Sequence, residues 1–188
     1  MEWKESLRKL ERNKQWDEAI EFMQAVIDQN HDDMDAYIAM NYLLMNLIIE
    51  EEWNNSNHSY YVEQLQKYID ESYDKFSYNA EYLYYMSQII SVSDCFIDAS
   101  DYNTKNMSVV ALKLDPLNPI YKWDYHYGIS EKNPKDKELL AYINNVLDEN
   151  SFIQKTLNSK GAIGEYFLDM MTGWARRILE KNDSSITT

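Results

Sequence analysis

Apolar side chains recur three or four positions apart through the first fifty residues of the chain. Between residues 13 and 30 they stand at Trp16, Ala19, Ile20, Met23, Val26 and Ile27. This spacing puts them on one stripe of an α-helix. The same spacing occurs earlier and later in this region, at Trp3, Leu7 and Leu10, and at Tyr37, Met40, Leu44, Leu47 and Ile48. The pattern therefore predicts three consecutive amphipathic helices.

The rest of the chain continues the helical pattern. Further helices are expected near residues 57–75, 78–92, 103–114, 119–129, 135–148 and 162–181. No proline precedes Pro116, no glycine precedes Gly128, and no run of five alternating β-branched residues indicates a strand. The sequence therefore predicts an all-α fold.

A longer period is superposed on the helical spacing. Trp3 and Tyr37 stand 34 residues apart, which is the length of a tetratricopeptide repeat. Residues 1–49 resemble one repeat of this family and the first helix of the next, with Ala19 at the small position where the two helices cross. Residues 111–119, ALKLDPLNP, resemble the end of a repeat, where proline stops the second helix.

The resemblance implies antiparallel helical hairpins stacked as a short tetratricopeptide-like solenoid. Residues 1–182 are expected to form a single helical-repeat domain, with the last helix as a C-terminal cap, and residues 183–188 a mobile polar tail. Asn41 and His31 depart from the family's pattern, which has glycine and proline there. In the family's register, the groove-facing side of the helix over 34–49 would carry Asp35, Ile38, Tyr42, Met45 and Ile49.

Residue types that support catalysis or cofactor binding are sparse. All four glycines follow residue 127, so no glycine-rich loop is present to cradle phosphates. A metal site at the His31–Asp32 pair would need another histidine upstream, and none precedes His31. We expect Asp32 or Asp33 to cap the next helix instead of binding a metal. The lone Cys95 is flanked by acids that disfavour a thiolate, so it is expected to be a buried structural residue. The sequence therefore predicts no catalytic residue, no metal and no cofactor.

The sequence also favours a cytoplasmic location. A single cysteine excludes an internal disulfide framework, and no basic-then-apolar leader opens the chain. The longest apolar stretch, residues 36–49, is too short and too polar to span a bilayer.

Acidity is concentrated in the middle of the chain. Residues 15–104 contain 18 acidic side chains and only two basic ones, Lys67 and Lys75. Such a surface repels the phosphates of nucleic acid and the anionic lipids of membranes, and it attracts a cationic protein. The alternative is that the acids serve only solubility. We expect a basic protein partner and neither nucleic acid nor membrane.

Tyrosine is enriched in the same region. Eight of the sixteen tyrosines lie between residues 60 and 85. Tyr78, Tyr82 and Tyr85 share one helical stripe and are expected in the core. Tyr84 falls off this stripe, and Tyr60 and Tyr61 open a helix, so we expect exposed rings among these three.

Three further acids, Asp94, Asp98 and Asp101, would share one face of a helix. Three carboxylates can hold Ca²⁺ or Mg²⁺, but a solvated acidic face is the expected outcome. The candidate partner-binding residues are Asp35, Tyr42, Glu50, Glu51, Glu52, Tyr60, Tyr61, Tyr84, Asp94, Asp98 and Asp101.

These observations favour a non-catalytic module that binds a basic protein through an acidic, tyrosine-bearing surface. One form of this hypothesis is an immunity protein that neutralises a cationic bacterial toxin such as a nuclease. The alternative is a tetratricopeptide-type adaptor or secretion chaperone that binds an extended peptide in its groove, at Ile38, Tyr42 and Met45. A hydrolase that depends on His31 is the third class considered.

Overall fold

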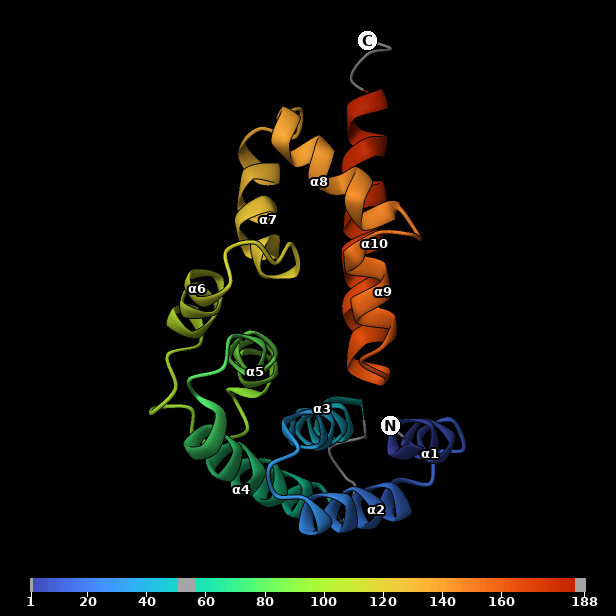
Figure 1. Cartoon of the computed structure of the whole chain (residues 1–188), viewed down its shortest axis with the longest axis vertical. Coiled ribbons are helices and arrows are strands. Elements are labelled where there is room, and N and C mark those ends of the chain that lie inside the picture. Colours follow the sequence, from blue (N-terminus) through green and yellow to red (C-terminus); the bar gives the residue numbers. More distant parts are fainter. Residues whose placement is uncertain (1, 51–56, 185–188) are drawn as a thin grey trace. The chain divides into compact units, whose positions relative to one another are not determined.

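The computed structural model describes residues 2–50 and 57–184, and these residues form ten α-helices, one 3-10 helix and no strand (Figure 1). The all-α prediction is therefore confirmed for this part of the chain. None of the described helices combines the length and the apolar character that a membrane crossing requires. The elements are α1 (Glu2–Arg12), α2 (Trp16–Gln29), α3 (Met34–Glu50), α4 (His58–Phe76), α5 (Ala80–Ser93), α6 (Thr104–Leu114), η1 (Ile120–Lys122), α7 (Trp123–Lys132), α8 (Lys137–Leu147), α9 (Phe152–Asn158) and α10 (Ala162–Ser184).

The helices group into two compact units, residues 1–115 (unit 1) and residues 116–188 (unit 2). A single domain over residues 1–182 stays a prediction. Helix α10 extends to Ser184, and residues 185–188 of the expected polar tail lie outside the described residues. The charge divides unevenly, because unit 1 carries 22 acidic and 9 basic side chains, whereas unit 2 carries 10 and 9. Unit 1 therefore holds nearly all of the net charge.

Helix α3 forms the centre of unit 1, where it packs against α2, α4 and α5. Its sequence, MDAYIAMNYLLMNLIIE, is apolar on nearly every face, and a helix of this kind is stable only when it is surrounded. One of its two asparagines, Asn41, is fully buried and donates from Nδ2 to the hydroxyl of Ser72 on α4, at 3.3 Å. The same hydroxyl lies 2.8 Å from the hydroxyl of Tyr82 on α5. This polar network links the three helices.

The peptide groove expected along this helix has no exposed side chains at its central positions. Ile38, Tyr42 and Met45 are 3%, 6% and 3% exposed. Their expected groove-facing placement is wrong because α3 is covered by its neighbours on the side where the repeat register predicted an open surface.

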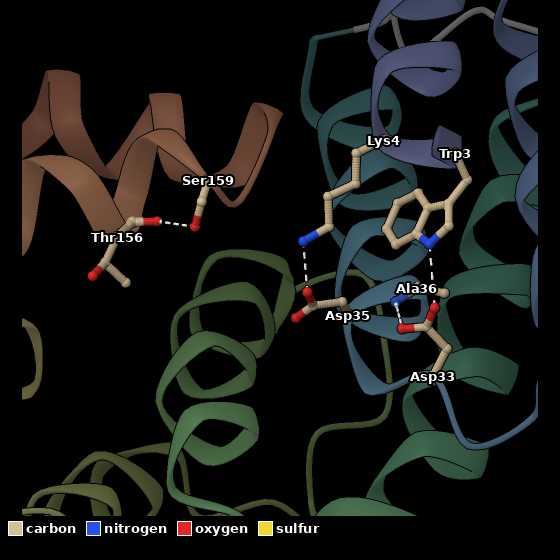
Figure 2. Close-up of polar contacts among 7 residues, drawn as sticks. All are labelled: Trp3, Lys4, Asp33, Asp35, Ala36, Thr156 and Ser159. Carbon is tan, nitrogen blue, oxygen red and sulfur yellow. Dashed lines mark hydrogen bonds and ion pairs between the residues drawn. The ribbon is translucent and has the colours of Figure 1, made fainter. Parts of the chain in front are cut away.

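The first turn of α3 is held by α1 (Figure 2). The Asp33 carboxylate accepts from the backbone N–H of Ala36 at 3.1 Å, so the prediction that Asp32 or Asp33 caps this helix is confirmed for Asp33. The indole Nε1 of Trp3 donates to the other oxygen of Asp33 at 3.2 Å, and Lys4 Nζ lies 2.5 Å from Asp35 Oδ2. These contacts connect the N-terminal helix to the central one.

In unit 2, α10 packs against α8 and α9 through an apolar stripe. The buried members of the stripe are Ile163, Phe167, Met171, Trp174 and Ile178. The closest approach in this helix is at Gly164, where an added Cβ would lie 1.9 Å from the carbonyl oxygen of Leu157 on α9. Two elements can approach this closely only where no Cβ intervenes.

We predict that Gly164→Ala destabilises the protein by about 1–3 kcal/mol, because α10 must move away from the backbone of α9. Gly173→Ala in the same helix is the matched control: nothing lies within 4 Å of its Cβ position. That change should raise the free energy of unfolding by up to about 1 kcal/mol, from helix propensity alone. Urea-induced unfolding measures both, and equal effects of the two substitutions would contradict the assigned contact.

Candidate functional site

Helix α4 presents one face to the core and another to an acidic pocket. Its buried residues, Tyr61, Leu65, Tyr68, Ile69, Ser72 and Phe76, follow the helical spacing. The pocket side carries Gln66, Asp70, Tyr73 and Asp74, which are spaced by four, three and one residues and so share a second face. The order of apolar and polar residues along α4 thus determines which of its side chains face the core and which can line the pocket.

The segment between α5 and α6, residues 94–103, lies beside α4 (Figure 1). The backbone N–H of Asp98 donates to Gln66 Oε1 at 2.8 Å, and Gln66 Nε2 donates to Asp70 Oδ1 at 2.9 Å. Ile97 is 8% exposed. Gln66 therefore connects α4 to the segment 94–103 and holds this segment at Asp98.

Tyr102 forms the second connection between this segment and α4. Its hydroxyl donates to Asp70 Oδ1, and its ring meets that of Tyr73 edge-on, with centroids 5.0 Å apart. Burial raises the pKa of Tyr102, and the hydrogen bond to Asp70 raises it further. The phenol therefore stays protonated at neutral pH and remains a donor to the carboxylate.

Together these residues enclose an open pocket of about 530 Å³, lined by Gln66, Asp70, Tyr73, Asp74, Asp98, Asp101 and Tyr102. Four of the lining residues are acidic and none is basic. The two lysines of residues 15–104 are engaged elsewhere: Lys67 lies 3.9 Å from Glu71, and Lys75 donates to the carbonyl of His31 at 3.0 Å. The pocket therefore concentrates negative charge.

The ionisation of Asp98 is favoured by its own loop. Hydrogen bonds from the Ser100 side chain and backbone hold the pKa of Asp98 below its usual range, and the Ser100 N–H lies 3.1 Å from Asp98 Oδ1. Carboxylates accept charge-assisted hydrogen bonds from ammonium and guanidinium groups, and aromatic faces attract the same cations. The chemistry of the pocket fits the binding of a cationic side chain.

Two predicted site residues, Asp98 and Asp101, line this pocket, but they do not share a helix face with Asp94. Helix α5 ends at Ser93, Asp94 is its C-cap, and the other two acids lie in the connecting segment. The prediction of one acidic helix face is therefore wrong, because the chain leaves the helix before the second acid. Asp94 is exposed and is not among the lining residues.

Asp35 and Glu50 are not among the residues that line the pocket. Asp35 bonds to Lys4, so a cation of the chain itself already pairs with its charge. Glu50 is exposed at the end of α3. Glu51 and Glu52 lie outside the described residues. A role for these acids in binding stays a prediction.

Most of the predicted contact tyrosines are buried. Tyr60 is 45% exposed, as expected, but Tyr61 and Tyr84 are 2% and 0% exposed. Tyr78, which was expected in the core, is 77% exposed. The expectation of an exposed ring is met by Tyr60 and fails for Tyr61 and Tyr84. Tyr84 is buried because the middle of α5 is buried on successive residues, and its ring packs edge-on against Tyr85. The prediction for Tyr78 is wrong because this residue precedes α5, which begins at Ala80.

Cys95 is exposed, which corrects the expectation of a buried thiol, because it follows the end of α5. Within the described ranges, no cluster of His, Cys, Asp or Glu side chains has the arrangement of a metal site.

The sequence reasoning missed Gln66, Asp70, Tyr73, Asp74 and Tyr102 as site residues. The spacing of Gln66, Asp70 and Asp74, four residues apart within a predicted helix, was a usable signal. The sequence holds no comparable signal for Tyr102, because its place in the pocket depends on a hydrogen bond to Asp70 of α4, 32 positions away.

Comparisons of this chain with protein-family models, curated proteins and solved structures gave no match.

We predict that Asp74→Asn stabilises the protein at low salt by about 0.2–0.5 kcal/mol, because it removes a like charge four residues from Asp70 on α4. In 1 M NaCl, where the Debye length is about 3 Å, this gain should disappear. Asp17→Asn, in the first turn of α2, is the control: its carboxylate favours the helix N-terminus, so the substitution should not stabilise. Urea-induced unfolding at two salt concentrations measures both. A gain that persists in high salt would contradict repulsion as its cause.

Proposed function

We propose that the protein is a non-catalytic binding module that holds a basic protein through the acidic pocket beside α4. The observation that carries this proposal is the convergence of four carboxylates and two tyrosine rings on one open pocket that no basic residue lines. An arginine or lysine of a partner could satisfy these acceptors directly. Long-range attraction to the excess acid of unit 1 would raise the association rate.

One specific form of the proposal is an immunity protein that neutralises a cationic bacterial toxin such as a nuclease. An enzyme that binds nucleic acid presents a positive surface for phosphates, and a carboxylate-rich surface can occupy it. This form is supported by the acidity of unit 1.

The packing of unit 1 supports stacked helical hairpins as its architecture. Consecutive helices α1 to α4 are neighbours, α5 and α6 are neighbours, and α3 also packs against α5. A tetratricopeptide-like array places the first helix of each hairpin against the first helix of the next, as α3 and α5 are placed here. The peptide-groove alternative has less support, because the side chains that it requires on α3 are buried.

Affinity capture with matched baits tests the proposed function. The baits are the wild-type chain, the pocket variant Asp74→Asn/Asp101→Asn, and the control variant Asp17→Asn/Glu18→Gln, whose two acids are exposed on α2. Both variants lose two charges, so they differ only in where the charges are lost. We expect a basic protein to be retained by the wild type and the control, and to be lost from the pocket variant.

The salt dependence of the same capture gives the second readout. Retention should fall steeply between 50 mM and 500 mM NaCl, because screening weakens exposed charge pairs. Equal retention by the pocket and control variants would contradict the proposed surface, and preferential recovery of RNA or DNA would contradict the class of partner.

A further inference from the structure

The core of unit 2 contains a buried histidine, His126, that takes no part in the acidic pocket. It lies on α7, is 2% exposed, and stacks on the ring of Tyr142 from α8 with centroids 4.0 Å apart. Its Nδ1 atom is buried and has no hydrogen-bond partner. A neutral imidazole tolerates this position, whereas an imidazolium would have two donors and would need an acceptor at Nδ1.

The same aromatic cluster holds several elements of unit 2 together. The Tyr142 hydroxyl donates to the carbonyl of Pro119 at 3.0 Å, which connects α8 to the start of η1. The Trp174 indole of α10 meets Trp123 of α7 edge-on at 4.7 Å and donates to the Ser130 hydroxyl at 3.2 Å. A change at the His126–Tyr142 stack therefore acts on the packing of α7 against α8 and reaches η1.

Charged groups around His126 come from three elements. Glu138 of α8 and Asp136 at its N-cap favour the protonated ring, and Lys122 of η1 opposes it. Asp124 of α7 lies near Tyr142, and α10 contributes the Trp174 indole, which does not titrate. Burial outweighs the two acids, so the pKa of His126 lies below its usual value of 6.5.

We propose that unit 2 contains an acid-sensitive switch, in which protonation of the buried His126 loosens the packing of α7 on α8 while unit 1 keeps its fold. The geometry that carries the proposal is a buried imidazole with an unpaired nitrogen at the contact between the two helices.

The sign of the effect follows from proton linkage. In the unfolded chain the histidine binds a proton below about pH 6.5, whereas in the folded unit it does so only at lower pH. The stability is therefore fully present above pH 6.5 and is lost as the pH falls below it. Glu11 of α1, in unit 1, titrates in the same pH range, because burial raises its pKa to about 7. Its effect on stability is opposite: a raised carboxyl pKa makes the folded state bind the proton more tightly, so acidification does not weaken unit 1 through this group.

Hydrogen exchange of the full-length chain, followed by mass spectrometry at pH 7.5 and pH 5.5, tests the switch. After correction for intrinsic exchange, the opening of peptides from α7 and α8 should increase by up to about tenfold at pH 5.5, the limit for one histidine with an unfolded pKa of 6.5. Peptides from α4 and α5 should not show this increase.

Two variants and a control assign the effect. His126→Phe keeps a ring against Tyr142 but has no titratable group, so it should abolish the increase in opening at pH 5.5. His126→Gln is the second variant, with the same expected result, for the case in which phenylalanine does not fit in the core. His31→Gln is the matched control, since His31 is exposed in unit 1, and it should leave the increase unchanged. An equal increase in both units, or an increase that survives loss of the His126 ring, would overturn the proposal.

The NMR titration of the His126 ring in the wild-type chain gives an independent readout that needs no variant. We expect the ring to stay neutral below pH 6.5 until the unit opens. A ring that protonates at pH 6.5 or above, with the α7–α8 contact intact, would overturn the switch.

Discussion

The structure around the acidic pocket depends on how repulsion between its carboxylates is offset. Like charges four residues apart on a helix, such as Asp70 and Asp74, repel by about 0.2–0.5 kcal/mol, and four carboxylates line this pocket. The opposing contacts are neutral donors: the Gln66 amide and the Tyr102 phenol both donate to Asp70, and Ser100 donates to Asp98. The acids are thus held by hydrogen bonds that leave their negative charge in place.

The remainder of unit 1 provides a rigid support for this arrangement. Helix α3 is enclosed by α2, α4 and α5, and the Asn41–Ser72–Tyr82 network fixes how α4 and α5 meet it. Burial of large tyrosine and aliphatic side chains supplies the favourable free energy that the surface charges oppose. Lys4, Lys67 and Lys75 pair with groups outside the pocket, so these three lysines leave its negative charge in place.

The sequence predicted the helices better than the site, for physical reasons. The stripe from Trp16 to Ile27 is long enough to display its period, and α2 covers it. Helix α9 went unpredicted because seven residues make only two turns. The burial of Tyr84 depends on packing around a whole helix, which a single stripe does not report. Asp98 and Asp101, which were predicted as partner-binding residues on a helix face, line the pocket from the segment after α5 instead. The bond from Asp98 to Gln66 spans 32 positions and leaves no local pattern in the sequence.

An NMR titration of the full-length protein with a nona-arginine peptide tests the central claim most directly. If the pocket is the cation-binding surface, the backbone amides of the segment from Asp98 to Tyr102 and of α4 near Asp70 should show the largest shift changes, and these should saturate together. Shift changes spread equally over all exposed acids, including Asp17 and Glu18 of α2, would contradict the claim that the pocket is a specific site for cations.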